Sequence, residues 1–372
     1  MKKLNILYSL KNIPLNSRIA IYGSGKIAIG FRKMVDESRK DINVSFFINS
    51  FKDGLQDDLS ILKYSGINNS EELFDLIIVC SSHWNEIINE LINDKQKFYV
   101  ISNEIMYNSI EISALGNFRF DKEFRNEIKL RLEKCLPFFD RENQKYFKLL
   151  MDLRLKDDES NIFEFLAKAN ELFRTPYLDY IDNTGGVILE GGVFDGADSV
   201  NFYNFFKNRS TKIIGFEPFM DAYENGPHYN FLSQKGMEVF PFALWNNNGE
   251  LTFKKNLISP SSSSISGGMD LIESPNTEIV IIKTITLDTF IENNNINNIS
   301  LIKMDIEGAE MEALAGAEKT IKSFKPNLAI SIYHKKEHLY EIPELLKIYN
   351  PDYKFALGFY SPTFIDTVLY AF

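Results

Sequence analysis

The sequence of 372 residues predicts a mixed α/β protein with two doubly wound sheets that a helical connector joins. Short apolar runs alternate with amphipathic segments over residues 1–105, and helical spacing dominates residues 106–184. The alternation of strands and helices starts again over residues 185–372. Because apolar strands that alternate with helices are typical of parallel sheets, we expect an accessory α/β domain, a connector and a second α/β domain with these boundaries.

The first domain is expected to be Rossmann-like. Its expected strands are residues 17–23, 43–50, 75–83 and 98–103, and its expected helices are residues 26–38 and 84–94. Gly23-Ser24-Gly25 lies between the first strand and the first helix, where glycines let phosphates approach the backbone at a helix N-terminus. The second strand ends in Asn49, whereas an NAD site needs an Asp or Glu there to hold the ribose. We expect no NAD binding, and we leave open a structural turn or a contact with a nucleotide-linked sugar.

The connector is predicted from apolar residues at three- and four-residue spacing. Residues 124–139, 143–155 and 163–173 have this spacing, and Pro137 is expected to end the first helix.

The second domain repeats the strand and helix pattern. Its expected strands are residues 187–191, 212–218, 238–245, 299–305 and 328–334. The clearest helix covers residues 309–324, and an extra hairpin is expected around residues 249–255. Residues 353–360 and 364–372 form two strands with a short connection, which predicts an antiparallel edge on a parallel sheet.

Composition excludes several classes of protein. Lys and Arg number 41 against 51 Asp and Glu, and the net charge of −10 argues against a dedicated nucleic-acid binder. Two cysteines, Cys80 and Cys135, are too few for a disulfide framework, so a reducing cytoplasm is expected. No apolar run reaches the ~18 residues that span a bilayer, so no membrane span is expected.

Glu190-Gly191-Gly192, followed by Asp195-Gly196, stands where the first strand of the second domain meets a helix. In a doubly wound sheet this is where a ligand binds. Acidic side chains beside a glycine turn suit a cationic ligand with an amino acid moiety better than a pyrophosphate. The alternative is a purely structural turn.

Glu217-Pro218 ends the next strand. A carboxylate at this place has two oxygens that match the vicinal hydroxyls of a ribose. The alternative is an exposed acid at a strand end.

Asp305 and Glu307 follow a later strand and alternate with Ile306, so both carboxylates should lie on one side. Paired carboxylates can orient an ammonium, hold a divalent ion or act as a base, and the alternative is capping of the helix that follows. His334 ends the strand 328–334 and can deprotonate a hydroxyl near neutral pH, unless it is only a polar strand end. His338 is expected to face solvent.

These segments, taken in order, resemble one family. They are VILEGGVFDGADS, IIGFEP, FALWNNNGELTF, LIKMDIEGAE and SIYHKKEHLYEIPELL. Over residues 185–372 the chain resembles the FkbM family of S-adenosylmethionine-dependent methyltransferases. The resemblance implies a class I methyltransferase fold, a seven-stranded sheet with an antiparallel last strand. It also implies O-methylation, often of a sugar or polyketide hydroxyl.

The resemblance also implies roles for individual residues. The glycine motif from Glu190 to Gly196 would hold the methionine end of the cofactor, Glu217 would hold the ribose, and the segment around Ala243 would line the adenine. Glu190 replaces the Asp that is common at this place, which keeps the chemistry with a longer reach.

We therefore expect a cytoplasmic S-adenosylmethionine-dependent O-methyltransferase that acts on a sugar or a glycan precursor. His334 is the expected base, with Asp305 or Glu307 orienting the acceptor or the cofactor. No metal site is predicted; a metal ion that bridges Asp305 and the acceptor stays open, although the sequence gives no ligand cluster to support it. The alternatives are a nucleotide-sugar oxidoreductase and a non-catalytic nucleotide- or sugar-binding scaffold. The oligomeric state stays open, with a homo-oligomer among the forms considered.

Overall fold

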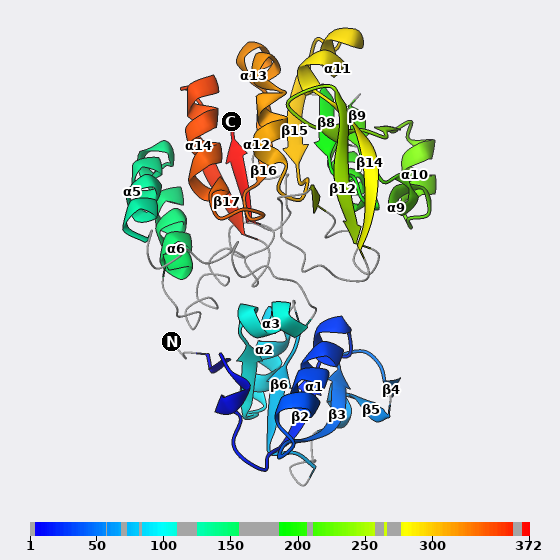
Figure 1. Ribbon diagram of the computed structural model, residues 1–372, viewed down its shortest axis with the longest axis vertical. Helices are drawn as coiled ribbons and strands as arrows, with labels where there is room; N and C mark the ends of the chain where they lie inside the picture. Colours follow the sequence, from blue (N-terminus) through cyan, green and yellow to red (C-terminus); the bar gives the residue numbers. More distant parts are fainter. Residues whose placement is uncertain are drawn as a thin grey trace. The chain divides into compact units, whose positions relative to one another are not determined.

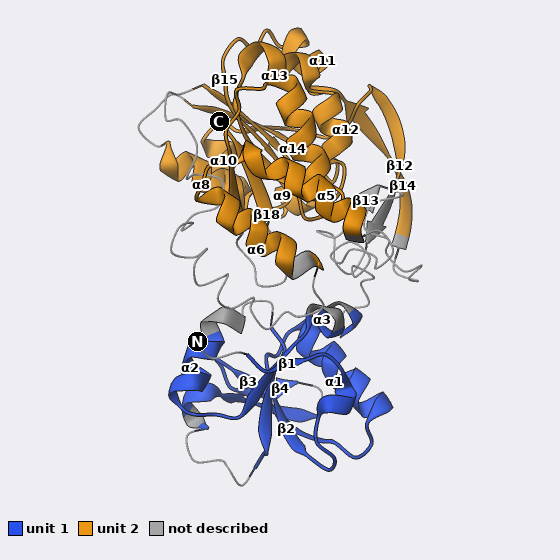
Figure 2. Ribbon diagram, turned by 90° about the vertical axis from the view of Figure 1, so that its left-hand side faces the viewer, with its two compact units in different colours: residues 1–116, 156–168, 361–364 blue, residues 117–155, 169–360, 365–372 orange. Residues whose placement is uncertain are grey.

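The computed structural model describes residues 4–56, 58–67, 73–81, 84–109, 125–155, 186–206, 211–256, 264–265, 277–359 and 367–372. Figure 2 shows the chain as two compact units, one of residues 1–116, 156–168 and 361–364 and one of residues 117–155, 169–360 and 365–372. The predicted mixed α/β class with mainly parallel sheets is confirmed. The boundaries at residues 105 and 185 stay predictions.

The first unit contains a seven-stranded sheet in the order β1-β7-β6-β2-β3-β5-β4. The strands are β1 (Ile6–Leu7), β2 (Arg18–Tyr22), β3 (Asn43–Asn49), β4 (Gly54–Gln56), β5 (Leu59–Lys63), β6 (Leu76–Val79) and β7 (Phe98–Ile101). The helices are α1 (Lys26–Ser38), α2 (Trp84–Asn93) and α3 (Asn103–Ser109). Among the described strand pairs of this sheet, only the pair of β4 and β5 is antiparallel.

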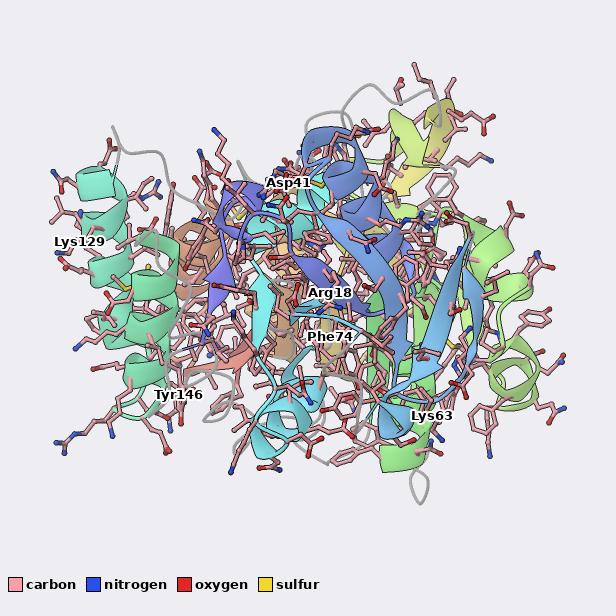
Figure 3. The ribbon with its side chains drawn as sticks, turned by 90° about the horizontal axis from the view of Figure 1, so that it is seen from below. Arg18, Asp41, Lys63, Phe74, Lys129 and Tyr146 are labelled. Carbon is pink, nitrogen blue, oxygen red and sulfur yellow. The ribbon has the colours of Figure 1, made fainter. Side chains whose placement is uncertain are left out.

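Charged residues surround the amino ends of the central strands of this sheet. Arg18 begins β2, and its Nη2 lies 2.9 Å from Oδ1 of Asp75, just before β6. Asp41 precedes β3, and its Oδ2 lies 2.7 Å from Nη2 of Arg39. Figure 3 labels Arg18 and Asp41 among the side chains of this unit. The strands between these pairs are buried, as the apolar patterns predict.

The second unit contains a seven-stranded sheet in the order β10-β9-β8-β15-β16-β18-β17 (Figure 1). The strands are β8 (Val187–Gly191), β9 (Lys212–Phe216), β10 (Glu238–Phe240), β15 (Ile299–Met304), β16 (Asn327–Ser331), β17 (Phe355–Phe359) and β18 (Thr367–Ala371). β18 lies between β16 and β17 and runs antiparallel to both. The other pairs in this sheet are parallel.

Helices cover both faces of this sheet, as Figure 2 shows. They are α8 (Ala197–Phe205), α9 (Met220–Glu224), α10 (Tyr229–Gln234), α11 (Leu287–Asn293), α12 (Glu310–Ala315), α13 (Glu318–Phe324) and α14 (His338–Tyr349). On one face Phe202 and Leu232, from α8 and α10, join a buried cluster with Ile188, Ile213 and Leu301 of the central strands. This packing holds α8 and α10 against the central strands of the sheet.

Two helices of the predicted connector, α5 (Arg125–Cys135) and α6 (Asn143–Leu155), belong to the second unit. Nη2 of Arg131 on α5 lies 2.7 Å from Oε2 of Glu344 on α14. Oδ1 of Asn143 accepts a hydrogen bond from the backbone of Leu357 on β17, at 3.2 Å. α5 ends before Pro137, as predicted, and the expected helix 163–173 lies outside the described residues.

A smaller sheet in the order β11-β14-β12-β13 also belongs to the second unit. Its strands are β11 (Ala243–Leu244), β12 (Gly249–Asn256), β13 (Ser264–Ile265) and β14 (Thr277–Ile285). β12 and β14 pair antiparallel over eight residue pairs, in the place of the expected hairpin. The predicted strand 238–245 is two strands, β10 and β11, which join different sheets on either side of Pro241.

The predicted helix 309–324 is also divided, into α12 and α13, around Gly316. A Cβ on Gly316 would lie 2.0 Å from the carbonyl oxygen of Trp245, so the backbone of another segment passes against the chain at this point. This tertiary contact explains why a run with continuous helical periodicity does not form one helix.

Among the described residues, no helix is both long and apolar enough to cross a membrane.

Candidate active site

The order of the strands indicates where the candidate site of the second unit lies. From β8 the chain continues to β9 on one side, whereas β15 lies on the other side. In open α/β sheets, ligands bind outside the carboxyl ends of the strands where the order reverses in this way. The candidate residues follow the carboxyl ends of β8, β9, β15 and β16, so the topology brings them to this edge.

The glycine turn after β8 requires its glycines. Gly192 has φ +77°, and a Cβ there would lie 1.9 Å from the carbonyl oxygen of Asp305. Gly196 has φ +85° and is the N-cap residue directly before α8, and Oδ1 of Asp195 accepts a hydrogen bond from the backbone of Ala197 at 3.0 Å. The turn therefore lies directly against the loop after β15, which joins the predicted glycine motif and the predicted Asp305 in one site.

Glu190 is fully buried beneath this turn. Its Oε2 accepts a hydrogen bond from Ser199, and its Oε1 lies 3.5 Å from Nζ of Lys303. Lys303 Nζ also lies 3.1 Å from Oδ2 of Asp198 and donates to the carbonyl oxygen of Gly192 at 3.0 Å. Both Glu190 oxygens thus face protein groups, and the network holds the turn from below.

Burial raises the pKa of Glu190 to about 7, although the Lys303 ammonium opposes this. Burial would lower the pKa of Lys303, but the carboxylates of Asp198 and Glu190 outweigh it and raise that pKa. The ammonium is therefore charged and compensates the two acids.

Glu217 follows β9 and fixes two backbone segments. Its Oε2 accepts a hydrogen bond from the N–H of Phe194 at 3.0 Å, and its Oε1 accepts one from Phe219 at 2.9 Å. The side chain is nearly buried, which raises its pKa above the ordinary value. A carboxylate oxygen has more than one lone pair, so each can still accept a ligand hydroxyl.

Ala243 and Leu244 form β11, which lies beside the glycine turn. A Cβ on Gly191 would lie 2.9 Å from Cδ1 of Leu244, so this strand closes the turn on its apolar side. Pro218, next to Glu217, is half-buried. The structure thus places the predicted adenine segment next to the glycine motif.

Asp305 and Glu307 follow β15 on a short loop. Glu307 has φ +56° and Gly308 has φ +96°, so the chain turns sharply before α12. The side chains of Asp305 and Glu307 are 21% and 27% exposed, and Tyr333 donates a hydrogen bond to Asp305 Oδ1 at 3.1 Å. Burial raises the pKa of the Glu307 carboxyl group.

His334 is fully buried behind these two carboxylates. Its Nε2 lies 3.5 Å from Asp305 Oδ1 and 3.3 Å from Glu307 Oε2, and its Nδ1 lies 2.8 Å from Oε1 of Glu310. Burial disfavours the imidazolium, but the carboxylates of Glu310 and Glu307 outweigh burial and raise the pKa of His334 well above its usual value. The predicted catalytic residues Asp305, Glu307 and His334 therefore lie together.

Glu310, which begins α12, is a member of this cluster that sequence reasoning missed. It is fully buried, and its Oε1 accepts a hydrogen bond from the backbone of Ile306 at 3.0 Å. Burial would raise the pKa of Glu310, but the His334 imidazolium lowers it to about 2. One ligand atom each from Asp305, Glu310 and His334 lies within 4.8 Å of the others, so this set can hold a metal ion.

His338 does not face solvent, in contrast to the prediction. It begins α14, is 1% exposed, and its Nδ1 lies 3.4 Å from Oε2 of Glu310. The residue belongs to the buried side of α14, which packs on α12. Burial lowers the pKa of His338 to about 4.

In the first unit, the glycine turn after β2 does not offer an acid to a ribose. Asn49, at the end of β3, donates from Nδ2 to Oγ of Ser24 at 2.8 Å. Its Oδ1 accepts hydrogen bonds from the backbones of Phe51 and Lys52, at 2.9 and 3.2 Å. The side chain that replaces the ribose-binding acid thus holds the protein's own loops.

Comparison with known proteins gives one family. Residues 191–359 match the family model described as the methyltransferase FkbM domain. None of the curated proteins compared with the chain matches it.

Among solved structures, a methyltransferase FkbM from Methylobacillus flagellatus KT is 16% identical, with a TM-score of 0.61. The match covers 96% of this chain and 90% of that chain, so it includes the first unit, which the sequence resemblance leaves out. At this identity the likeness shows a shared fold. Fibrillarin from Aeropyrum pernix, in complex with S-adenosyl-L-methionine, is 10% identical over 56% of this chain and 74% of that chain, with a TM-score of 0.33.

Proposed function

Because residues 191–359 match the methyltransferase FkbM domain, we propose that the protein transfers a methyl group from S-adenosylmethionine to a hydroxyl of a sugar or glycan precursor. The observation that supports this most is the cluster of Asp305, Glu307 and His334 beside the glycine turn after β8. The cluster can bind and deprotonate an acceptor, and the glycine turn with its acidic side chains can hold a cationic cofactor.

The cofactor would lie across the carboxyl ends of β8 and β9. The glycine turn from Gly191 to Gly196 would hold the methionine end of the cofactor, and Glu217 would accept hydrogen bonds from the ribose hydroxyls. Ala243 and Pro218 would border the adenine and the ribose. In this arrangement Glu190 stabilises the turn through Lys303 and does not touch the cofactor.

The carboxylates of Asp305 and Glu307 are the groups that an acceptor hydroxyl meets first, because His334 lies covered behind them. We therefore assign the base to Glu307, and we revise His334, the base expected from the sequence, to a positioning residue. Methyl transfer requires the acceptor oxygen, the methyl carbon and the sulfur to lie in line. As the oxygen attacks, its proton passes to an Oε of Glu307, and His334 keeps that carboxylate in place.

The test of the activity is transfer of labelled methyl from S-adenosylmethionine to a panel of sugars and glycan precursors, with hydroxyl-blocked versions as controls. Transfer to the free hydroxyl only is expected. Transfer to an amine or a thiol, or none with any acceptor despite cofactor binding, would refute the proposed reaction.

The test of the base is Glu307→Gln. A general base typically contributes ~10²–10⁴-fold to the rate, so kcat should fall by about that factor while cofactor affinity stays unchanged. Glu312→Gln, on the helix α12 that follows this loop but outside the cluster, is the matched control and should keep wild-type kcat. If Glu307→Gln keeps more than half of the wild-type kcat, the base is another residue.

A further inference from the structure

We infer that Asp305, Glu310 and His334 bind a divalent metal ion at the carboxyl ends of β15 and β16. Each offers one ligand atom, and these three atoms lie within 4.8 Å of one another. Three atoms with this spacing can all lie within about 2.8 Å of one point, whereas metal–ligand bonds are about 2.0–2.6 Å long. Shifts of a few tenths of an ångström at each side chain therefore complete the site.

The hydrogen bonding of the cluster points to a missing partner. Both ring nitrogens of His334 lie close to carboxylates, yet neither makes a hydrogen bond of acceptable geometry to any described residue. Oε2 of Glu310 also lacks such a bond within the described part of the chain, and both side chains are fully buried. Because buried polar atoms without hydrogen bonds are costly, a ligand that satisfies several of them at once is favoured.

The charges of the cluster agree with a divalent cation. Three carboxylates, those of Asp305, Glu307 and Glu310, lie beside two imidazoles, those of His334 and His338, so acidic groups outnumber basic ones in the cluster. Lys303, the buried ammonium nearest in the chain, also acts electrostatically on Asp305, but its Nζ forms ion pairs with two further acids, Glu190 and Asp198. A divalent ion would offset the excess of negative charge that this leaves.

The types of ligand select the class of metal. Imidazole favours ions such as Zn²⁺, and carboxylates favour Mg²⁺, Ca²⁺ and Mn²⁺, so a mixed set of one imidazole and two carboxylates fits Mn²⁺ or Zn²⁺. Asp305 is 21% exposed and Glu310 is buried, so the open positions of the ion would face the acceptor.

The role of the ion rests on the proposed function, whereas the site itself does not. An acceptor hydroxyl bound to the ion has a lowered pKa and gives up its proton more readily. Glu307 is not one of the three inferred ligands, so it is free to take that proton. The ion and Glu307 would then act on the same hydroxyl.

The experiment is a titration of the metal-free full chain with Mn²⁺, followed by the loss of the electron paramagnetic resonance signal of the free ion, and with Zn²⁺ by calorimetry. We expect one site with micromolar affinity for at least one of the two ions. Asp305→Asn and Glu310→Gln should each weaken that affinity at least about tenfold. Glu312→Gln, also on α12, is the matched control and should bind like the wild type.

Two results would overturn the metal site: neither ion binds below millimolar concentration, or Asp305→Asn and Glu310→Gln bind as tightly as the control. Asp305 is partly exposed, so its variant reports on the site even if Glu310→Gln fails to fold. Binding of S-adenosylhomocysteine in the presence of a chelator tests the proposed function separately. If the cofactor binds and no metal does, only the metal site is refuted.

Discussion

Lys303 is a buried charge whose removal should have a large effect that depends on pH. Lys303 is 2% exposed and Glu190 is fully buried, and the two are an ion pair under the glycine turn. Lys303→Met keeps most of the volume of the side chain but leaves Glu190 without its cation. Breaking a buried pair on one side typically costs ~3–5 kcal/mol, because the remaining charge is buried without compensation.

The loss of stability in Lys303→Met should become smaller as the pH falls. The pKa of folded Glu190 is about 7, against an ordinary value of 4.5, and in Lys303→Met it should be higher still because the ammonium lowers it. A carboxyl group whose pKa is raised by folding contributes stability below its unfolded value, and this is lost as the pH rises through the folded value. The variant should therefore be destabilised most near pH 8 and much less near pH 5.

The assay is urea unfolding at both pH values, followed by tryptophan fluorescence. The chain has two tryptophans, Trp84 and Trp245, so a Trp84→Phe background leaves a single reporter in the second unit. Adding Glu190→Gln to Lys303→Met removes the uncompensated charge and should recover at least half of the loss at pH 8.

The control is Lys322→Met, which removes an exposed partner of Glu318 and should change stability by less than about 0.5 kcal/mol. The reasoning is refuted if Lys303→Met costs under about 1 kcal/mol at pH 8. It is also refuted if Lys303→Met loses the same stability at pH 5 and at pH 8, since the charge of Glu190 would then not cause the destabilisation.

Three further predictions concern the two glycine turns and the cofactor. Gly192→Ala and Gly236→Ala both place an alanine at φ near +77°, which costs roughly 1–2 kcal/mol. Only the alanine at position 192 would also clash, with the carbonyl oxygen of Asp305, so Gly192→Ala alone should lose cofactor binding in calorimetry. Equal binding by both variants would show that the turn does not approach the cofactor. Glu217→Ala should weaken S-adenosylhomocysteine about tenfold to hundredfold, and unchanged affinity in a folded variant would remove Glu217 from the site. NAD should not raise the melting temperature of the full chain, because Asn49 holds its own loops, and a clear shift at micromolar NAD would contradict this.

The strands and the row of candidate site residues at their carboxyl ends were predictable from the sequence. Parallel strands align their carboxyl ends at one edge, so the positions of Glu217, Asp305 and His334 at strand ends already implied proximity. The contact of Asp305 and Glu307 with His334 in the structure is consistent with this alignment. The sequence could not tell which of these groups is covered and which is exposed.

What the sequence did not reveal depends on contacts between distant segments. Lys303 stands as a charged residue in an apolar strand, and this signal alone could have indicated a buried partner, but not that the partner is Glu190. The burial of Glu310 and His338 results from the packing of α12 on α14, which no local pattern records. The division of the helix at Gly316 depends on the backbone of Trp245 in the same way.

The position of β18 has a consequence for folding during synthesis. The segment that forms β18 follows β17 along the chain but lies between β16 and β17 in the sheet. Until the segment of β18 has emerged from the ribosome, β16 has a free edge of backbone donors and acceptors, and β17 has no neighbour to join it to the sheet. Such edges pair readily with other chains, so the interval between the emergence of β16 and that of β18 is when the nascent protein is most open to aggregation and most in need of a chaperone.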